Sequence, residues 1–237
     1  MKQVLCSGSL GDASIVVAKL HSPEAPFSPN EVLLTHATAR RHKGNVVRSI
    51  CEFYAYQRLN CEIRIVDHGG DWVKAHRDEY DFHLKSQWWA DGDWEMPAQA
   101  PLIHRPIQDV DIVLCPSSGY KMERSFPAEE VLKFASKSKR HITLCGWADL
   151  ATEKVIRSQS MDNITCLLNR TVMRQFIDIL MSAKVVICNA GFAAYVAAMG
   201  GAKVHACGFH KAYFHPDWDV TFISGIVNGK LKKVKKK

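Results

Sequence analysis

Short apolar runs alternate with segments of helical periodicity along most of this chain. The apolar runs predict strands, and segments whose apolar positions recur every three or four residues predict helices. The expected strands are 2–6, 31–35, 61–66, 111–115, 141–145, 163–168, 184–188, 203–207 and 220–223. The expected helices are 12–20, 45–58, one beginning near Asp71, 127–138, 149–160, 171–183 and 191–200. This alternation predicts an α/β fold with mostly parallel sheets, and the uniformly apolar strands indicate that helices cover both sheet faces.

The segment 68–108 breaks the alternation and is the best candidate for a domain boundary. It is rich in Asp, Trp, His and Pro, with prolines at 97, 101 and 106. Its tryptophans, Trp88, Trp89 and Trp94, could pack a loop onto the body or form a stacking platform for a base or sugar. We therefore expect an N-terminal domain over 1–108, a C-terminal domain over 109–229 and a basic tail over 230–237.

The positive charge of the chain is concentrated in that tail. The formal net charge is +7, and six lysines lie in the last eight residues, KLKKVKKK, so the rest of the chain is near +1. Such a tail is either a solvated, disordered end or a segment attracted to a polyanion or an anionic membrane surface.

Composition otherwise describes an ordinary globular protein, with 47% hydrophobic and 23% charged residues. No apolar run reaches the roughly 18 residues of a membrane span, and the N-terminal apolar stretch is too short for a signal peptide, so we expect a cytoplasmic location. The cysteines form no C-x-x-C pair and the histidines at 205, 210 and 215 share no helical face, so neither a disulfide framework nor a metal site is expected. Five cysteines close apolar runs and are expected to be buried as small hydrophobes: Cys6, Cys115, Cys145, Cys188 and Cys207.

The turn after the first strand, CSGSLGD, is the first candidate for chemistry, because ligands of open α/β sheets bind at the carboxyl ends of strands. Gly8 and Gly11 let the backbone approach a ligand, and the following helix offers free N–H groups. Asp12 is either a general base or the N-cap of helix 12–20, and the spacing favours the N-cap. Neither a G-x-G-x-x-G dinucleotide pattern nor a P-loop is present.

A second turn, 115–127, carries small hydroxyl residues and cations ahead of a helix. Ser117 and Ser118 are followed by Lys121 and Arg124. This combination suits a phosphate or diphosphate, although the charges could equally be ordinary surface charges on a loop.

A third turn, Asn189-Ala190-Gly191, places small residues at another helix start. It could meet a ligand, or it could serve only the close packing of helix on sheet.

Together these turns resemble glycosyltransferase family nine, the lipopolysaccharide heptosyltransferase family. VLCSGSLGDASIV is similar to that family's first strand, glycine turn and helix, and DIVLCPSSGYKMERSFPAEEVLKFA resembles the start of its second domain. HITLCGWAD and TVMRQFIDILMSAKVVICNAGFAAYVAAMGGAKVHACG follow the pattern of the elements after that. The resemblance covers about 2–20 and 109–210, and it implies a GT-B fold of two Rossmann-like halves, with the acceptor on the first and the donor on the second.

The resemblance also implies roles for individual residues. Asp12 corresponds to the family's catalytic base, which deprotonates the acceptor hydroxyl for attack at the anomeric carbon. Lys121 or Arg124 would hold the donor's diphosphate and stabilise the leaving charge. The nucleotide-sugar site implied in this way comprises Gly11, Ser117, Ser118, Lys121, Arg124, Gly146, Asn189, Ala190 and Gly191. The sugar nucleotide is a substrate, and no cofactor or metal is expected.

Two departures from the family pattern affect the substrates. The Asp of the family's third turn is Asn189 here, without the following His, and the first half is short, so a lipopolysaccharide acceptor is not supported. The function expected is transfer of a sugar from a nucleotide-diphosphate sugar to an acceptor hydroxyl, on a saccharide or on a modified base in DNA. The alternatives are a non-catalytic nucleotide- or sugar-binding protein on the same fold and another nucleotide-dependent α/β enzyme, such as a dehydrogenase.

Overall fold

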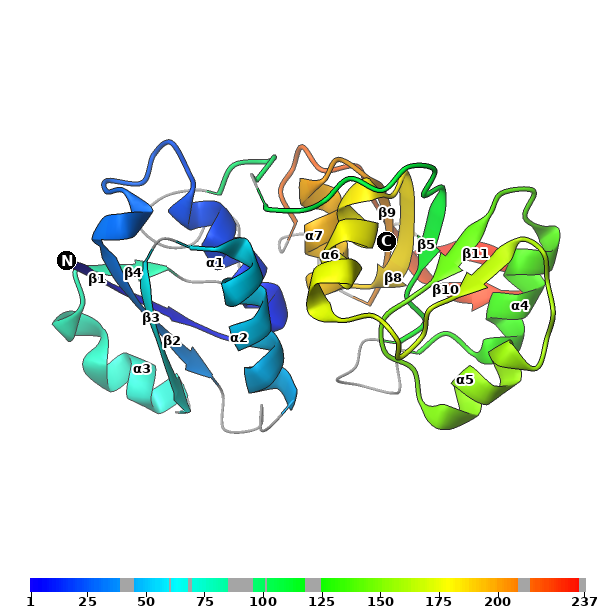
Figure 1. Ribbon diagram of the computed structural model, residues 1–237, viewed down its shortest axis with the longest axis horizontal. Helices are drawn as coiled ribbons and strands as arrows, with labels where there is room; N and C mark the ends of the chain where they lie inside the picture. The colour runs from blue at the N-terminus through cyan, green and yellow to red at the C-terminus, as the bar shows by residue number, and fades with distance from the viewer. Residues whose placement is uncertain are drawn as a thin grey trace. The chain divides into compact units, whose positions relative to one another are not determined.

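The computed structural model describes residues 1–38, 45–59, 61–67, 70–84, 96–100, 102–117, 125–208 and 214–234. The chain divides into two compact units (Figure 1). Unit 1 comprises Met1–Ile103 and Ala212–Pro216, and unit 2 comprises His104–Lys211 and Asp217–Lys237. The larger parts of the two units therefore meet in the sequence at Ile103, within the proline-containing segment.

Unit 1 is built on a four-stranded parallel sheet with the strand order β3-β2-β1-β4. Its strands are β1 (Lys2–Ser7), β2 (Val32–Thr38), β3 (Glu62–Asp67) and β4 (Phe82–Leu84), and its helices are α1 (Leu10–Leu20), α2 (Asn45–Gln57) and α3 (Gly70–His76), with short 3-10 turns at Pro29–Glu31 and Arg77–Glu79. Each parallel connection crosses over through a helix, as parallel pairing requires.

Alternation along the strands of unit 1 sends side chains to two different layers. Leu5 and Ala37 face α3, where Val73 completes a small core cluster. Cys6 and His36 lie opposite each other on the other face, which is covered by α1 and α2, whose helices contact each other (Figure 1). The sheet is therefore covered on both faces, as the apolar strands predicted.

Unit 2 contains a seven-stranded sheet with the order β11-β10-β9-β8-β5-β6-β7, in which only the β10–β11 pair is antiparallel. Its strands are β5 (Ile112–Leu114), β6 (Ile142–Leu144), β7 (Ile164–Cys166), β8 (Val185–Asn189), β9 (Lys203–Cys207), β10 (Val220–Val227) and β11 (Lys230–Lys233). Its helices are α4 (Ala128–Lys137), α5 (Leu150–Arg157), α6 (Met173–Ser182) and α7 (Phe192–Met199).

The main core of unit 2 lies between this sheet and the helices α4 and α5. Val131 and Ala135 of α4 and Ile156 of α5 pack with inward residues such as Leu114 and Ile187. On α6, the apolar residues Ile177 and Leu180 are fully buried. In the described part of the chain, no helix is long and apolar enough to span a membrane.

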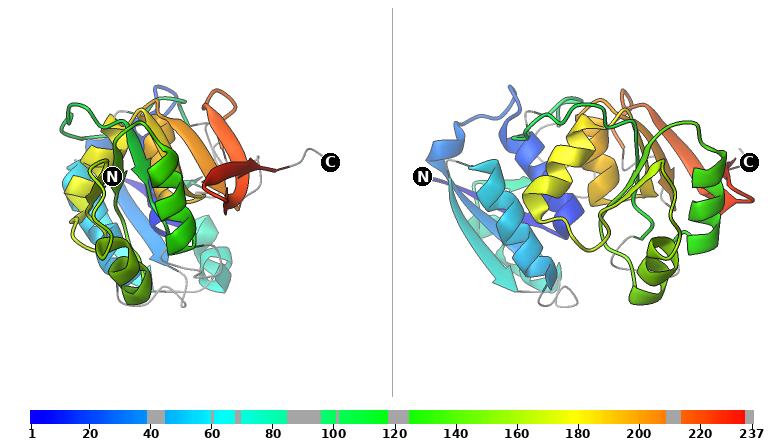
Figure 2. Two further views of the ribbon diagram at one scale, coloured as in Figure 1. Left: turned by 90° about the vertical axis from the view of Figure 1, so that its right-hand side faces the viewer. Right: turned by 45° about the vertical axis from the view of Figure 1, so that its right-hand side comes forward.

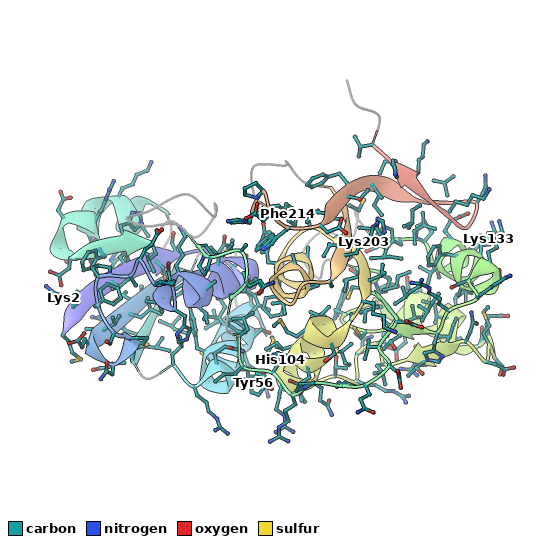
Figure 3. All side chains as sticks on the ribbon, turned by 90° about the horizontal axis from the view of Figure 1, so that it is seen from above. Lys2, Tyr56, His104, Lys133, Lys203 and Phe214 are labelled. Carbon is teal, nitrogen blue, oxygen red and sulfur yellow. The ribbon has the colours of Figure 1, made fainter. Side chains whose placement is uncertain are left out.

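The start of the basic tail is a strand rather than a disordered end. Lys230–Lys233 forms a strand that pairs with β10 near the C-terminal end of the chain (Figure 2). Leu231 packs against the core, while the lysines on either side of it are exposed. The turn before it is fixed on α4, because Gly229 N–H donates to Glu130 at 2.9 Å and a Cβ on Gly229 would meet the Lys133 carbonyl oxygen at 2.6 Å (Figure 3). The prediction of an unstructured tail is wrong for this segment, because one inward leucine between lysines is enough for an edge strand.

Most elements lie where the sequence pattern placed them. Every predicted strand and helix is present with ends shifted by a few residues, and the fold class is confirmed. The pattern missed β4, a strand of three residues. The tryptophans at 88, 89 and 94 lie outside the described residues, so their role stays a prediction.

Candidate active site

The first strand of unit 1 marks a point where the strand order reverses. From β1 the chain adds β2 and β3 on one side and then returns to place β4 on the other. Ligands of open α/β sheets bind in the crevice beyond the carboxyl ends of such strands. In unit 1 this position is occupied by the turn that follows Ser7, which carries Asp12 into α1.

Asp12 lies in the first turn of α1 but is not its N-cap. The helix begins at Leu10 with Ser9 as N-cap, so Asp12 is the third helical residue. Its Oδ2 accepts hydrogen bonds from the Ser9 backbone N–H at 2.5 Å and from the Ser9 hydroxyl at 2.8 Å. The N-cap assignment was wrong because Ser9 is an equally good cap and starts the helix three residues earlier, leaving Asp12 to reach back as in a capping box.

The backbone of the turn is shaped around this carboxylate. Gly8 has a φ of 131°, and a Cβ there would lie 2.3 Å from Asp12 Oδ2. Any side chain at position 8 would therefore both strain the backbone and displace the carboxylate.

Burial shifts the proton affinity of Asp12 upward. Desolvation raises the pKa of its carboxyl, and the two hydrogen bonds from Ser9 oppose that rise without cancelling it. A carboxyl with a raised pKa, at the carboxyl end of the central strand, has the properties of a general base.

A buried pair of polar side chains supports the same turn from beneath. His36 of β2 is fully buried, its Nε2 lies 3.2 Å from the Gly8 carbonyl oxygen, and its Nδ1 lies 2.6 Å from the Tyr54 hydroxyl on α2. A carbonyl oxygen can only accept, so Nε2–H donates to Gly8. Burial raises the pKa of Tyr54 well above its usual value, so the hydroxyl keeps its proton and donates to Nδ1. His36 and Tyr54 were not identified as part of the site from the sequence. The sign of the pair in the sequence is one histidine inside a mostly apolar strand.

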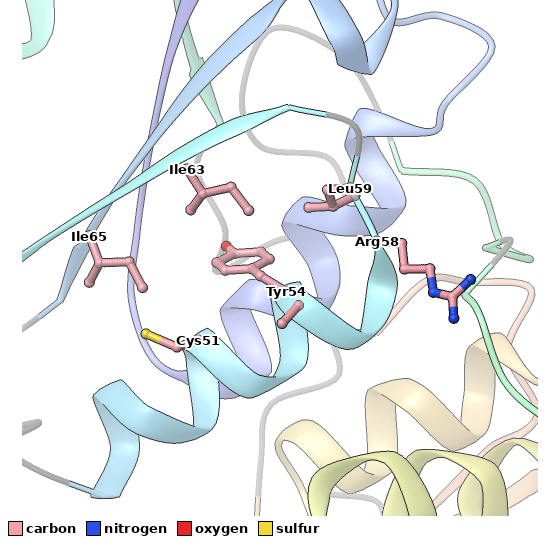
Figure 4. Close-up of a pocket in the computed structure, with 7 residues that line it drawn as sticks. Cys51, Tyr54, Arg58, Leu59, Ile63 and Ile65 are labelled. Carbon is pink, nitrogen blue, oxygen red and sulfur yellow. The ribbon is translucent and has the colours of Figure 1, made fainter.

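Tyr54 also lines a cavity of about 510 Å³ between α2 and β3 (Figure 4). The other lining residues are mostly apolar: Cys51, Ala55, Arg58, Leu59, Ile63 and Ile65. Asp12 does not line this cavity, so the candidate site is placed by the strand order and by the Asp12 network instead.

Unit 2 repeats the reversal of strand order around β5. The chain adds β6 and β7 on one side of β5 and then returns to place β8 and β9 on the other. The second and third turns of the sequence analysis follow β5 and β8, which are adjacent strands: Cys115 N–H donates to the Ile187 carbonyl at 2.9 Å. The carboxyl ends of β5 and β8 therefore lie side by side, at the position where open α/β sheets have their ligand crevice.

The turn after β5 is described only at its two ends. Ser117 accepts a hydrogen bond from the Ser125 hydroxyl at 3.0 Å, and Phe126 N–H donates to the Pro116 carbonyl at 2.7 Å, so the ends are tied together. Ser118, Lys121 and Arg124 lie outside the described residues, so their part in the site stays a prediction.

The turn after β8 holds a buried amide without a partner. Asn189 is 4% exposed, and neither Nδ2 nor Oδ1 has a hydrogen-bond partner in the described part of the chain. Ala190 N–H donates to the Cys207 carbonyl at 2.9 Å. Gly191, the N-cap of α7, has a φ of 144°, and no atom of the described residues lies within 4 Å of where its Cβ would be. An unsatisfied buried amide beside an open helix N-terminus is what a polar ligand would complete.

Buried thiols lie at the carboxyl ends of the strands that precede these turns. Cys115, Cys145 and Cys188 close the adjacent strands β5, β6 and β8 and are buried, with 3.9 Å between Cys115 Sγ and Cys145 Sγ. The prediction of buried cysteines at strand ends is confirmed for these and for Cys6, whereas Cys207 is half-buried. All eight cysteines are free, and the described residues contain no group of three His, Cys, Asp or Glu side chains placed to hold a metal.

Gly146, the remaining residue of the predicted donor site, follows β6 with a φ of 87°. It lies beyond the end of the strand next to β5, one strand removed from the crevice. Within the described residues, unit 2 thus brings together Ser117, Gly146 and the turn at 189–191, whereas Gly11 and Asp12 belong to unit 1.

No family model matches the sequence, and no curated protein matches it either. Solved structures do match the fold. A family 9 glycosyl transferase of Veillonella parvula aligns with a TM-score of 0.64 and 12% identity, over 94% of this chain and 86% of that one. The heptosyltransferase WaaC of E. coli, solved with ADP, aligns with a TM-score of 0.55 and 12% identity, over 97% and 94%.

The E. coli ADP-heptose lps heptosyltransferase II aligns with a TM-score of 0.55 and 10% identity, over 94% of this chain and 90% of that one. The chain therefore has the heptosyltransferase-like fold of family 9 glycosyltransferases, with two Rossmann-like halves of mostly parallel sheets. At these identities the likeness establishes the fold, and the activity has to be argued from the residues themselves.

Proposed function

We propose that the protein is a glycosyltransferase that moves a sugar from a nucleotide-diphosphate sugar to an acceptor hydroxyl. The observation that carries the proposal is Asp12: a carboxyl of raised pKa, fixed by Ser9 and supported through Gly8 by a buried His–Tyr pair. Burial gives this carboxyl a higher affinity for a proton, which is a property that a general base needs.

The proposed reaction is a single displacement. The acceptor oxygen attacks the anomeric carbon while its proton passes to Asp12, and the bond from that carbon to the diphosphate oxygen breaks. The nucleoside diphosphate leaves with the bonding electrons. Asp12 must be ionised to accept the proton, so the rate should rise with pH through its raised pKa and level off above it.

Donor binding is assigned to the crevice of unit 2. The Asn189 amide, which has no partner among the described residues, and the positive end of the α7 dipole beside it suit a phosphate or sugar oxygen. Lys121 and Arg124 are proposed to neutralise the diphosphate, and no metal is required because those cations would carry the leaving charge. One similar protein, the heptosyltransferase WaaC, was solved with ADP and with ADP-2-deoxy-2-fluoro heptose, which supports the assignment.

The test is a thermal-shift screen against ADP-, UDP-, GDP-, CDP- and TDP-sugars, followed by measurement of nucleoside diphosphate release. A ligand that binds only the folded state raises the melting temperature. Stabilisation with release that depends on Asp12 supports the transferase. Stabilisation without release under any acceptor supports the non-catalytic binding protein, and stabilisation by none of the donors overturns both.

The acceptor is proposed to be a saccharide or a base in DNA. An experiment on the basic tail distinguishes these two acceptors. Truncation after Val234 removes three lysines and keeps β11. For a DNA acceptor, this truncation should weaken DNA binding at about 50 mM salt and flatten its salt dependence up to about 200 mM. Equal DNA binding by the full chain and the truncated chain at both salts would favour a saccharide.

A further inference from the structure

A tryptophan stands exposed just beyond the strand that borders the donor crevice. Trp147 follows Gly146 at the end of β6, and 45% of its surface is exposed to solvent. An indole is one of the largest apolar groups a protein contains, and leaving it in water forgoes much of the free energy that its burial would provide. The next residue, Ala148, is buried. The inward-facing position of this loop is therefore occupied by a small residue, and the tryptophan is at the exposed position.

The loop that presents Trp147 is held rigidly. The side chain of Asn169 makes two hydrogen bonds to the backbone of Ala148 in this loop. Its Oδ1 accepts from the Ala148 N–H at 3.0 Å, and its Nδ2 donates to the Ala148 carbonyl at 2.9 Å. Asn169 N–H also donates to the Gly146 carbonyl at 3.0 Å. On the far side Asp149 caps α5, accepting from Thr152 N–H at 2.9 Å. The backbone on either side of the indole is therefore fixed, and little entropy remains to be lost when a ligand stacks on it.

The place of this loop in the sheet relates it to the proposed phosphate turns. The strands β8, β5 and β6 are consecutive neighbours, and all three run in the same direction. With about 4.8 Å between neighbouring strands, their carboxyl ends form a row about 10 Å across. Asn189 lies at one end of that row, and Trp147 lies just beyond the other end. The length of the row is comparable with that of an extended nucleoside diphosphate.

We infer that Trp147 is the stacking platform for the nucleobase of the donor, with the diphosphate at the turn after β8. The inference rests on the proposed function, since it extends the donor site by one strand. Stacking needs only the flat face of a base, so Trp147 supplies affinity for a nucleoside, and the choice among bases falls to polar groups at its edge.

The experiment is calorimetric titration of ADP, UDP, GDP, CDP, TDP and inorganic diphosphate into the full chain and into Trp147→Ala. We expect the variant to bind the preferred nucleoside diphosphate roughly 10- to 100-fold more weakly, because that is the range found when a stacking aromatic is removed. Affinity for inorganic diphosphate should stay unchanged, since it has no base to stack. Trp147→Phe should restore most of the lost affinity.

Leu150 provides the matched control, because it is 82% exposed at the start of α5 and only three residues away. Leu150→Ala should bind every probe as the parent does. Unchanged nucleotide affinity in Trp147→Ala overturns the inference and leaves the proposed function standing, and so does an equal loss for inorganic diphosphate, which would mean that the loop had merely deformed. If the parent chain binds none of the six probes, the proposed function itself fails.

Discussion

The strand order reverses at β1 in unit 1 and at β5 in unit 2, and the polar groups near these two points are satisfied in different ways. In unit 1, the turn after β1 is filled by protein groups: Asp12 bonds to Ser9, and His36 bridges Tyr54 and the Gly8 carbonyl. In unit 2, the turn after β8, the strand beside β5, leaves the Asn189 amide without a hydrogen-bond partner among the described residues. One site is complete in itself, and the other has unsatisfied polar groups.

The difference indicates how the two sites divide the work. A chemical group that must sit at one place with one protonation state is held by bonds from the protein, at the cost of burying polar atoms. A binding site instead keeps donors and acceptors unsatisfied, and a ligand supplies the missing bonds. We therefore expect substitutions in unit 1 to alter stability and rate, and substitutions in unit 2 to alter affinity.

The glycines at the two turns give the largest expected contrast. Gly8→Ala meets both an unfavourable φ and the Asp12 carboxylate, and should lower the free energy of unfolding by about 4 kcal/mol. Gly191→Ala meets an unfavourable φ in open space and should lower it by about 2 kcal/mol. Urea unfolding of both variants measures the difference, and equal losses would mean that the carboxylate moves aside freely.

Asp12→Asn should separate chemistry from stability in unit 1. We expect turnover to fall at least about a hundredfold, equivalent to about 2.7 kcal/mol, because the amide cannot accept the proton. The raised pKa means that the folded state binds this proton more tightly than the unfolded chain does, so the ionised carboxylate lowers stability as pH rises from its unfolded value through the raised one.

Asparagine does not ionise, so this variant should melt at the same temperature as the parent or higher at neutral pH. Melting curves at pH 4 and pH 8 check the sign: any gain should be present at the higher pH and absent at the lower. A variant that keeps its turnover would remove Asp12 from the mechanism.

Tyr54→Phe should weaken the support beneath the turn. It leaves Nδ1 of the buried His36 without the hydroxyl that donates to it, at a cost of about 2 kcal/mol in the free energy of unfolding. Because the Gly8 turn is then less well held, turnover should fall more than donor affinity does. Tyr80→Phe, on the α3 side of the same sheet, is the control and should change neither quantity.

Asn189→Ala should give the smallest effect, with opposite signs for stability and binding. Removing a buried amide that makes no hydrogen bond to the described residues should leave the melting temperature unchanged or raise it. Donor affinity should fall about tenfold, or about 1.4 kcal/mol, since the ligand loses its polar partner. Loss of stability without loss of affinity would show that the amide serves the fold.

The sequence predicted the order of elements well because periodicity within an element is local information. It missed β4, since three residues are too few to show alternation, and it misread Lys230–Lys233 because a high lysine content concealed the inward Leu231. The fold class needed neither element, since the remaining parallel strands and crossover helices already specify it.

The site was only partly predictable. Asp12, Asn189 and Gly191 could be proposed from the sequence because each follows an apolar run, a signal carried by neighbours in sequence. The roles of His36 and Tyr54 depend on a contact between β2 and α2, and no local pattern encodes such a pairing. The cap of α1 was misassigned because two good capping residues, Ser9 and Asp12, lie within one helical turn.

The placement of β8 beside β5 also has a consequence for how the protein is made. A ribosome delivers β1 and β2 early, so the Asp12 turn and its His–Tyr support can assemble while most of unit 2 is still unsynthesised. The donor crevice must wait, because β5 stays open on one side until α5, β7 and α6 have emerged and β8 arrives to pair with it. During that interval one backbone edge of β5 has no strand partner, so nascent unit 2 is open to pairing with the wrong strand.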